Sequence, residues 1–268
     1  MRVLILSWEY PPLIEGGLAR HVRKLAENLV RQGVDVHVLT RGHEESRVAV
    51  IPNGIDPSEL VPVDDLETLR GRFAEPHEKL VLLVGRLVYE KGFQLALEAL
   101  PGLIERVGNV RFIVAGSGTA EQELKEQATR LGLDDHGTFV GWIGDDVLHS
   151  LYRISDLTVV PSIYEPFGLV ALEAMASGCP CLVADTGGLR EVVPNEEVGL
   201  RFRSRDPASL ATMAERLLTD EELRDRLVAE ASEHVLTFDW ADVARQVAGV
   251  YGEVVTDASA SARRAARS

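Results

Sequence analysis

Apolar residues in this chain form short continuous runs that alternate with longer stretches in which they recur every three or four positions. The runs predict strands buried on both faces, and the spaced stretches predict amphipathic helices. The chain opens with a run at 2–6, a helical stripe at 18–31 and a second run at 34–39. This order predicts one βαβ unit, which a polar stretch at 41–47 joins to a short strand at 48–51.

A longer alternation of the same kind occupies the rest of the chain. Strands are predicted at 80–84, 111–115, 138–140, 157–160, 180–184 and 199–202. Helices are predicted at about 64–73, 93–107, 120–131, 145–154, 168–177, 187–193, 207–218, 220–235 and 239–254. This alternation predicts a parallel sheet covered on both faces, in a doubly wound α/β domain. Ligands of such domains bind beyond the carboxyl ends of the strands.

The charge balance narrows the choice of partners. The 268 residues include 28 Lys and Arg against 42 Asp and Glu, which gives a net charge of −14. A nucleic-acid-binding protein usually shows a basic face, so we expect no nucleic acid partner, although a local basic site is still allowed. No apolar stretch approaches the roughly 18 residues of a membrane helix, so we also expect no transmembrane segment.

The positions of the cysteines and histidines do not predict a disulfide, a metal site or a catalytic nucleophile. Cys179 and Cys181 stand two apart on a predicted strand, so their side chains point to opposite faces and should not form a disulfide. The seven histidines show no metal-ligand spacing, and two thiols alone cannot make a zinc site. We therefore expect no metal, no serine or cysteine nucleophile and a reduced, cytoplasmic setting.

The turn at 84–92 is the first candidate site. It places Arg86 and Lys91 at the carboxyl end of a predicted strand, beside Gly85 and Gly92. Two cations in this position suit a diphosphate, because Arg forks onto phosphate oxygens and Lys acts as a mobile point charge. A solvated pair on a surface loop is the alternative interpretation.

The segment at 164–173 is the second candidate site. Glu165 lies in the loop after a strand, and Glu173 lies inside the helix that begins near Gly168. The free N–H groups at that helix start can bind an anion or a hydroxyl group. Acidic residues in dinucleotide sites bind ribose hydroxyls, which is a role open to Glu173. The alternative is a helix with ordinary capping and exposed acids.

Two further glycine turns carry weaker signals. Gly16 and Gly17 open the first predicted helix, which is an anion-binding geometry but also an ordinary turn. Gly116 and Gly118 also follow a strand, yet Glu121 stands where G-x-G-x-x-G has its last glycine. The sequence therefore does not favour a nicotinamide site.

Together these motifs resemble those of the retaining family 4 glycosyltransferases of the GT-B fold, a group that includes bacterial glycogen and sucrose synthases. The matching stretches are W-E-Y-P-P-x-x-x-G-G at 8–17, I-P-N-G-I-D at 51–56, G-R-L-x-x-E-K-G at 85–92, F-V-G-W at 139–142, E-P-F-G-L-V-A-L-E at 165–173, A-D-T-G-G-L-R-E at 184–191 and F-D-W at 238–240. The resemblance implies a GT-B-like α/β fold and a UDP-, ADP- or GDP-hexose donor bound without a metal ion or other cofactor. It also implies transfer of the hexose to a carbohydrate or small-molecule acceptor with retention of configuration.

The resemblance also implies residue roles. Arg86 and Lys91 would hold the diphosphate and stabilise the leaving group, and Glu165 would contact the donor sugar. The implied donor-binding residues are Gly17, Gly85, Trp142, Phe167, Gly168, Leu169 and Glu173. Among them, Glu173 would bind the ribose hydroxyls, and Trp142 would lie near the base.

The N-terminal part departs from the family pattern. A GT-B protein has a full doubly wound N-terminal domain, whereas residues 1–56 predict one βαβ unit and one strand, which is marginal as an independent domain. The family keeps most acceptor contacts, and a histidine that touches the donor sugar, in the missing middle. We expect a truncated remnant at 1–56, a donor-binding domain at 57–238, a helix that crosses back at 239–256 and a disordered tail at 257–268.

Three functions fit this pattern. The first is a retaining hexosyltransferase. The second is a nucleotide-sugar-binding remnant without catalysis, which the reduced acceptor side favours. The third is a GT-B sugar-nucleotide epimerase, which the spacing of Glu165 and Glu173 together with the turn at 85–92 disfavours.

Overall fold

The computed structural model of the protein describes residues 2–6, 35–39, 51–63 and 65–265. The chain divides into two compact units. The smaller unit comprises Met1–Ile51 and Arg245–Ser268, and the larger one comprises Pro52–Ala244.

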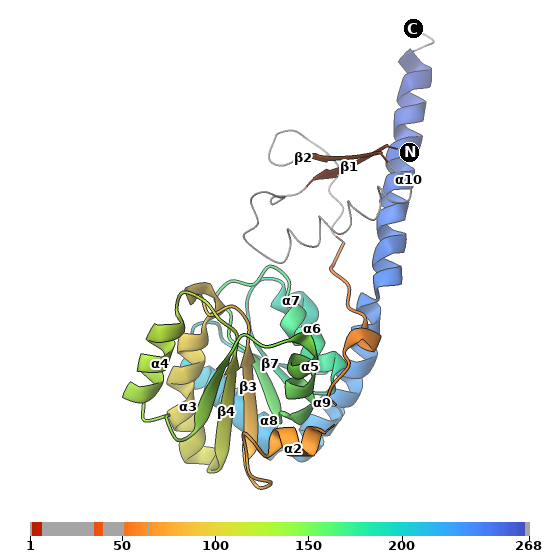
Figure 1. The fold of residues 1–268 in the computed structure, drawn as a ribbon. Helices are drawn as coiled ribbons and strands as arrows, with labels where there is room; N and C mark the ends of the chain where they lie inside the picture. Colours follow the sequence, from red (N-terminus) through yellow and green to blue (C-terminus); the bar gives the residue numbers. More distant parts are fainter. Residues whose placement is uncertain (1, 7–34, 40–50, 64, 266–268) are drawn as a thin grey trace. The chain divides into compact units, whose positions relative to one another are not determined.

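The larger unit is built on a six-stranded parallel sheet (Figure 1). Its strands are β3 (Lys79–Val84), β4 (Val110–Ala115), β5 (Gly137–Gly141), β6 (Leu157–Val160), β7 (Cys181–Ala184) and β8 (Leu200–Phe202). Their order across the sheet is β5-β4-β3-β6-β7-β8. The strand order therefore reverses between β3 and β6, and a doubly wound sheet opens its ligand crevice at that switch point.

Helices cover both faces of this sheet (Figure 1). They are α2 (Leu66–Arg70), α3 (Phe93–Val107), α4 (Glu121–Arg130), α5 (Asp145–Ile154), α6 (Leu169–Ala176), α7 (Leu189–Val192), α8 (Pro207–Thr219) and α9 (Glu221–His234), with short 3-10 turns η1 (Pro57–Glu59), η2 (Tyr89–Lys91) and η3 (Val235–Phe238). Helix α3 packs against α4 and α8, whereas α5 packs against α2 and α6. The two groups lie on opposite faces, as right-handed crossovers require.

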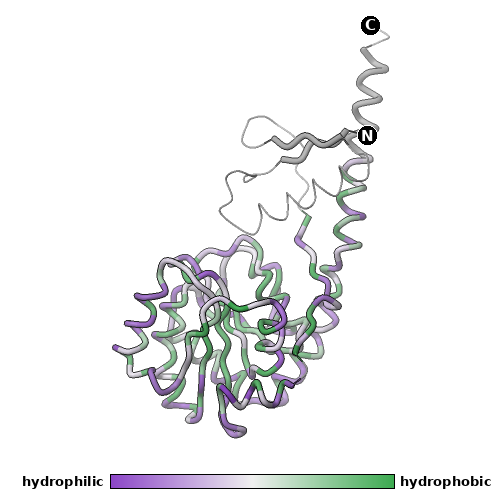
Figure 2. The backbone as a smooth tube through the Cα atoms, viewed as in Figure 1, coloured by the Kyte–Doolittle hydropathy of each residue, from purple (hydrophilic) through white to green (hydrophobic). Residues whose placement is uncertain are grey.

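Burial in the core explains why most strand positions are apolar. Every residue of β6 and β7 is buried, as are the four central residues of β3. Figure 2 shows hydrophobic positions gathered on the strands, with hydrophilic positions on the outer turns and outer helix faces. The predicted doubly wound α/β fold is confirmed, and the strand and helix ends of the larger unit up to α9 differ from the predicted ones by only a few residues.

The smaller unit contains a two-stranded parallel sheet. Strands β1 (Arg2–Leu6) and β2 (Asp35–Leu39) run in register from the pair Arg2 and Asp35. Both strands were expected from the apolar runs. The helix predicted at 18–31 and most of the strand predicted at 48–51 lie outside the described residues.

The C-terminal segment corrects one prediction. Helix α10 (Trp240–Ala265) is longer than the predicted helix and includes residues 257–265, which were expected to be disordered. Disorder was expected because this segment is small and polar. Its alanines favour a helix, because alanine has the highest helix propensity of all residues.

The two segments that enter and leave the larger unit are tied together. Ile55 forms a parallel bridge with Asp239, and its N–H donates to the Phe238 carbonyl at 2.8 Å. Gly54 lies so close to Trp240 that a Cβ atom there would come within 2.5 Å of the indole Cδ2. The I-P-N-G-I-D and F-D-W motifs are therefore in direct contact where the chain enters and leaves the larger unit.

Candidate active site

The candidate site lies at the carboxyl ends of β3 and β6, the two strands that flank the switch point. The loop after β3 ends at Gly92, which has a φ of 72° and lies directly against the end of β6. A Cβ atom at Gly92 would come within 2.0 Å of the Pro161 carbonyl oxygen. Because only glycine permits this approach, Gly92 sets how close the β3 loop comes to the β6 loop.

This close approach brings Lys91 and Glu165 into contact. Lys91 Nζ lies 2.6 Å from Glu165 Oε2, and the Ser162 hydroxyl donates to the same oxygen at 3.1 Å. The two side chains are largely buried, with exposed fractions of 20% for Lys91 and 11% for Glu165. An ammonium group has three donors, so Lys91 can bind Glu165 and still donate to an anionic ligand.

The backbone around Glu165 is held by the turn after β7. The Gly188 N–H donates to the Glu165 carbonyl at 2.9 Å. A Cβ atom at Gly187 would lie 2.3 Å from that carbonyl oxygen, and one at Gly188 would lie 2.4 Å from the Pro166 carbonyl oxygen. The paired glycines therefore let one strand-end loop pack on another and fix the position of Glu165.

The start of α6 forms the next part of the site. Gly168 caps the helix with a φ of 116°, and a Cβ atom there would lie 2.7 Å from Leu189 Cδ2. Phe167 packs edge-to-face on Phe238 with ring centroids 6.0 Å apart. Leu169 is exposed. The first N–H groups of α6 have no carbonyl of the preceding turn to bind, so this helix start can receive a polar ligand group.

Glu173 lies further along α6 and contacts the helix beside it. The Tyr152 hydroxyl on α5 donates to Glu173 Oε2 at 2.8 Å. Burial raises the pKa of the Glu173 carboxyl, whereas the hydrogen bond from Tyr152 and the charge of His149 lower it, and Asp145 raises it further. Burial and the Glu173 charge raise the pKa of Tyr152 well above its ordinary value. Tyr152 is therefore a neutral donor to this carboxylate.

The other predicted site residues are spread along the same edge of the sheet. Arg86 is exposed on the loop that ends at Lys91, directly after Gly85, whose φ is 145°. Trp142 follows β5 at the sheet edge and is 77% exposed. Gly17 lies outside the described residues. The structure thus joins Lys91 to Glu165, keeps Arg86 on the same loop and leaves Trp142 two strands away from β3.

Sequence reasoning missed two polar residues of this region. Ser162 binds Glu165, and its position at the end of β6, three residues before the acid, was an available signal. Tyr152 gave no signal, because it lies on the buried face of an amphipathic helix with Leu151 and Ile154 and resembles a core residue. The glycines of the A-D-T-G-G stretch were seen as part of a motif, but not as the support of Glu165.

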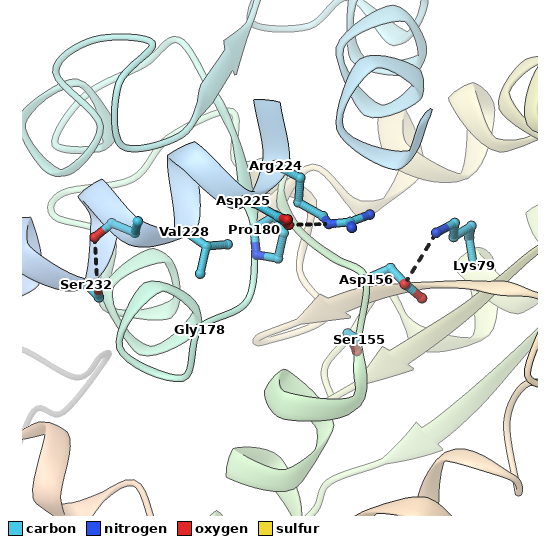
Figure 3. A pocket seen from close by; sticks show the side chains of 10 residues that line it. Lys79, Ser155, Asp156, Gly178, Pro180, Arg224, Asp225, Val228 and Ser232 are labelled. Atoms are coloured by element: carbon cyan, nitrogen blue, oxygen red, sulfur yellow. Dashed lines mark hydrogen bonds and ion pairs between the residues drawn. The ribbon is translucent and has the colours of Figure 1, made fainter. Parts of the chain in front are cut away.

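A hollow of about 470 Å³ lies at the opposite end of the same sheet (Figure 3). Lys79 at the start of β3, Asp156 before β6, and Arg224 and Asp225 on α9 line it. Lys79 pairs with Asp156 at 3.9 Å and Arg224 with Asp225 at 3.5 Å, so the cations are balanced. This hollow lies at the amino ends of the strands, away from the switch point, and we place no function in it.

The described residues give no sign of a thiol or metal site. Cys179 and Cys181 are buried and unpaired with each other, and burial raises the pKa of Cys179 to about 12 and that of Cys181 further. Within the described ranges, no three His, Cys, Asp or Glu residues are placed to hold a metal ion. None of the helices described there is long and apolar enough to cross a membrane.

Comparison with known proteins identifies the family. The family model of glycosyl transferases group 1 matches residues 66–234, which include Lys91, Glu165 and Glu173. The chain belongs to the group 1 glycosyltransferases. A second family model, the starch synthase catalytic domain, matches residues 2–68.

Relatives of this group 1 glycosyltransferase extend well beyond it. A glycosyltransferase of Methanocaldococcus jannaschii, MJ1607, is 37% identical over 212 residues, which are 77% of this chain and 54% of that protein. Glycogen synthase of Mycobacterium tuberculosis is 33% identical over 253 residues, which are 89% of this chain and 58% of the relative. The chain thus spans about half the length of the curated relatives it matches.

The fold of this group 1 glycosyltransferase also matches solved structures. The sucrose-phosphate synthase of Thermosynechococcus elongatus superposes with a TM-score of 0.69 at 26% identity, over 96% of this chain and 59% of that one. Together with the six-stranded parallel sheet, this match establishes the GT-B-like α/β fold that the sequence predicted.

Proposed function

We propose that this chain transfers a hexose from a nucleotide sugar to an acceptor hydroxyl with retention of the anomeric configuration. The donor is a UDP-, ADP- or GDP-hexose, and the acceptor is a carbohydrate or another small molecule. The proposal needs no metal ion, because two side-chain cations serve the diphosphate. It also assumes a cytoplasmic setting, where such donors and reduced thiols occur together.

The Lys91–Glu165 pair at the switch point carries this proposal. It is a largely buried ion pair with a 2.6 Å contact, in the crevice where doubly wound sheets bind nucleotides. A cation in such a crevice suits a diphosphate, and the adjoining carboxylate holds it in place at 2.6 Å. The membership of the chain in the group 1 glycosyltransferases supports the same interpretation.

The reaction breaks the bond between the anomeric carbon and the diphosphate oxygen. Negative charge grows on the leaving diphosphate, and Lys91 and Arg86 stabilise it in the transition state. Retention requires the acceptor to attack on the face from which the diphosphate leaves. The acceptor oxygen then bonds to the anomeric carbon, and its proton passes to the departing phosphate.

The remaining residues bind the donor in this proposal. Glu165 contacts the sugar, and Glu173 accepts hydrogen bonds from the ribose hydroxyls. The N–H groups at 167–169 bind polar groups of the sugar, with Gly168 as the helix cap. Gly85 lets the backbone approach the diphosphate, Trp142 lies near the base, and Gly17 is a further donor-binding residue.

A second candidate function is nucleotide-sugar binding without transfer. It is favoured by one observation, namely that the chain spans about half the length of its curated relatives. Titration calorimetry with UDP, ADP and GDP, followed by an assay for sugar released from the matching nucleotide sugar, separates the two. Binding with sugar release or transfer supports the enzyme. Binding without either, at any acceptor tried, supports the second candidate, and no binding contradicts both.

A further inference from the structure

Tyr152 is a buried side chain with one polar contact to the proposed site. It lies on α5 with an exposed fraction of 0%, and its hydroxyl donates to Glu173 Oε2 on α6 at 2.8 Å. A phenol removed from water requires a hydrogen-bond partner. Here that partner is a carboxylate, so the contact links the core of α5 to a group at the ligand edge.

The two oxygens of Glu173 differ in their surroundings. Oε2 is held by Tyr152, whereas no protein group among the described residues binds Oε1. Among the described residues, the fully buried side-chain oxygen or nitrogen without a hydrogen-bond partner is Ser177 Oγ. Glu173 Oε1 also has no partner but is not fully buried, so it is in contact with solvent. The terminal torsion of glutamate is soft, and a carboxylate fixed at neither oxygen would rotate.

We propose that Tyr152 is a positioning residue for Glu173, which fixes Oε2 so that Oε1 faces the ribose hydroxyls of the nucleotide. This inference rests on the proposed function, which assigns the ribose to Glu173. A ligand contact is more selective when a second residue holds the contacting group in place. Tyr152 therefore contributes to the choice of ribose without touching it.

The charge balance around Glu173 supports this role. Burial favours the neutral acid, and the Asp145 charge acts in the same direction. The hydrogen bond from Tyr152 and the charge of His149 both favour the carboxylate, which is the form that accepts two hydroxyl hydrogens. Tyr152 thus helps to keep the acceptor both charged and oriented.

The test compares ribose recognition in the wild type and in Tyr152→Phe. Calorimetry measures Kd for UDP, ADP and GDP and for their 2′,3′-dideoxy counterparts, which lack both hydroxyls. Whichever of the three nucleotides the wild type binds, its Kd should be about 10-fold lower than the Kd of the corresponding dideoxy nucleotide. Tyr152→Phe should reduce this ratio by about 2- to 10-fold and leave Kd for the dideoxy form unchanged.

Three controls separate positioning from structure. Tyr251→Phe removes the hydroxyl of a half-buried tyrosine on α10 and should leave the ratio unchanged. In a Glu173→Gln background, Tyr152→Phe should have little further effect on the ratio, since the pair acts as a unit. If Tyr152→Phe does not fold, Tyr152→Met supplies a flexible side chain of similar length without the hydroxyl.

The outcomes are distinct. A folded Tyr152 variant with the wild-type ratio would overturn the inference and leave Tyr152 a core residue. Wild-type binding with no preference for ribose would overturn both the inference and the role of Glu173, while nucleotide binding would stand. A wild type that binds none of the nucleotides would instead overturn the proposed function.

Discussion

The two ends of the strands in Pro52–Ala244 both carry a lysine beside a carboxylate, yet the surroundings of the two pairs differ. At the carboxyl end, Lys91 and Glu165 lie 2.6 Å apart with exposed fractions of 20% and 11%. At the amino end, Lys79 and Asp156 lie 3.9 Å apart with exposed fractions of 30% and 20%. The amino end also has the 470 Å³ hollow.

The difference lies in how the neighbouring loops pack. At the carboxyl end, Gly92, Gly187 and Gly188 let backbone meet backbone, so that loops from three strands converge on one ion pair. At the amino end, Asp156 is used within the fold, since Oδ2 accepts from the Leu80 N–H and from Arg70. We therefore place the candidate site at the buried pair beside the switch point and not at the hollow, where Lys79 and Arg224 each have an acidic partner.

The largest expected effect is the loss of sugar release in Lys91→Ala. Removing one donor to a developing negative charge costs about 100- to 1,000-fold in kcat. The variant also leaves Glu165 without its cation, so it should unfold at a lower temperature. The rate is measured as sugar released from the nucleotide sugar that the protein accepts.

Two variants sharpen this result. Lys91→Ala with Glu165→Gln should recover much of the thermal stability but not the activity, because the buried charge is removed and the diphosphate contact stays lost. Lys79→Ala should leave sugar release unchanged. Equal losses in Lys79→Ala and Lys91→Ala would contradict the contrast between the two ends of the sheet.

The next largest effect is expected for Gly92→Ala. The alanine would adopt a φ of 72°, and its Cβ would overlap the Pro161 carbonyl oxygen at 2.0 Å. We expect a lower melting temperature and weaker nucleotide binding, since the loop that carries Lys91 must move. Thermal unfolding and calorimetry measure the two effects.

Gly178→Ala is the matched control at the amino end. Gly178 has a φ of 75°, but a Cβ atom there would meet nothing within 4 Å. The left-handed backbone conformation should lower the free energy of unfolding of this variant by about 1 kcal/mol, and its nucleotide affinity should not change. If Gly92→Ala were no more harmful than Gly178→Ala, the close approach of the two loops would not matter to the site.

A smaller effect is expected for Asp156→Asn at the amino end. The charged acceptor of Arg70 becomes neutral, and a part-buried bond of this kind contributes about 1.5 kcal/mol to the free energy of unfolding. In a unit of this size that should lower Tm by roughly 3–6 °C, with nucleotide affinity unchanged. An altered affinity would show that the amino end takes part in binding.

The smallest effect is expected for Glu173→Gln, and it depends on pH. Because the folded-state pKa of Glu173 is raised, its contribution to stability is present at low pH and is lost as the pH rises through that pKa. The variant cannot ionise, so its gain in Tm over the wild type should be larger at pH 7 than at pH 4. Thermal unfolding at both pH values checks this. A gain that does not change with pH would contradict the buried charge of Glu173.

Much of the fold could be predicted from the sequence because the strands are buried on both faces. Residues of β6 and β7, all buried, form short runs that are mostly apolar and rich in β-branched residues, and a run of that length is typical of a buried strand. The C-terminal tail could not be read in this way. Its composition suggested disorder, whereas the alanine content of α10 favours a helix.

The sequence predicts which residues lie near the candidate site but not how they contact one another. Lys91 and Glu165 follow strand ends that a doubly wound fold brings to one edge, so their residue types and positions were readable. Their direct contact was not, because it depends on where Gly92 meets Pro161 in three dimensions. Tyr152 was not readable either, since a phenol on the buried face of α5 looks like core in any single sequence.

A crystal structure with the bound nucleoside diphosphate tests the location of the site most directly. We predict density for the diphosphate between the loop that ends at Lys91 and the loop that carries Glu165, with the ribose beside Glu173. Density in the hollow lined by Lys79 and Arg224, with none at the carboxyl ends of β3 and β6, would contradict the assignment.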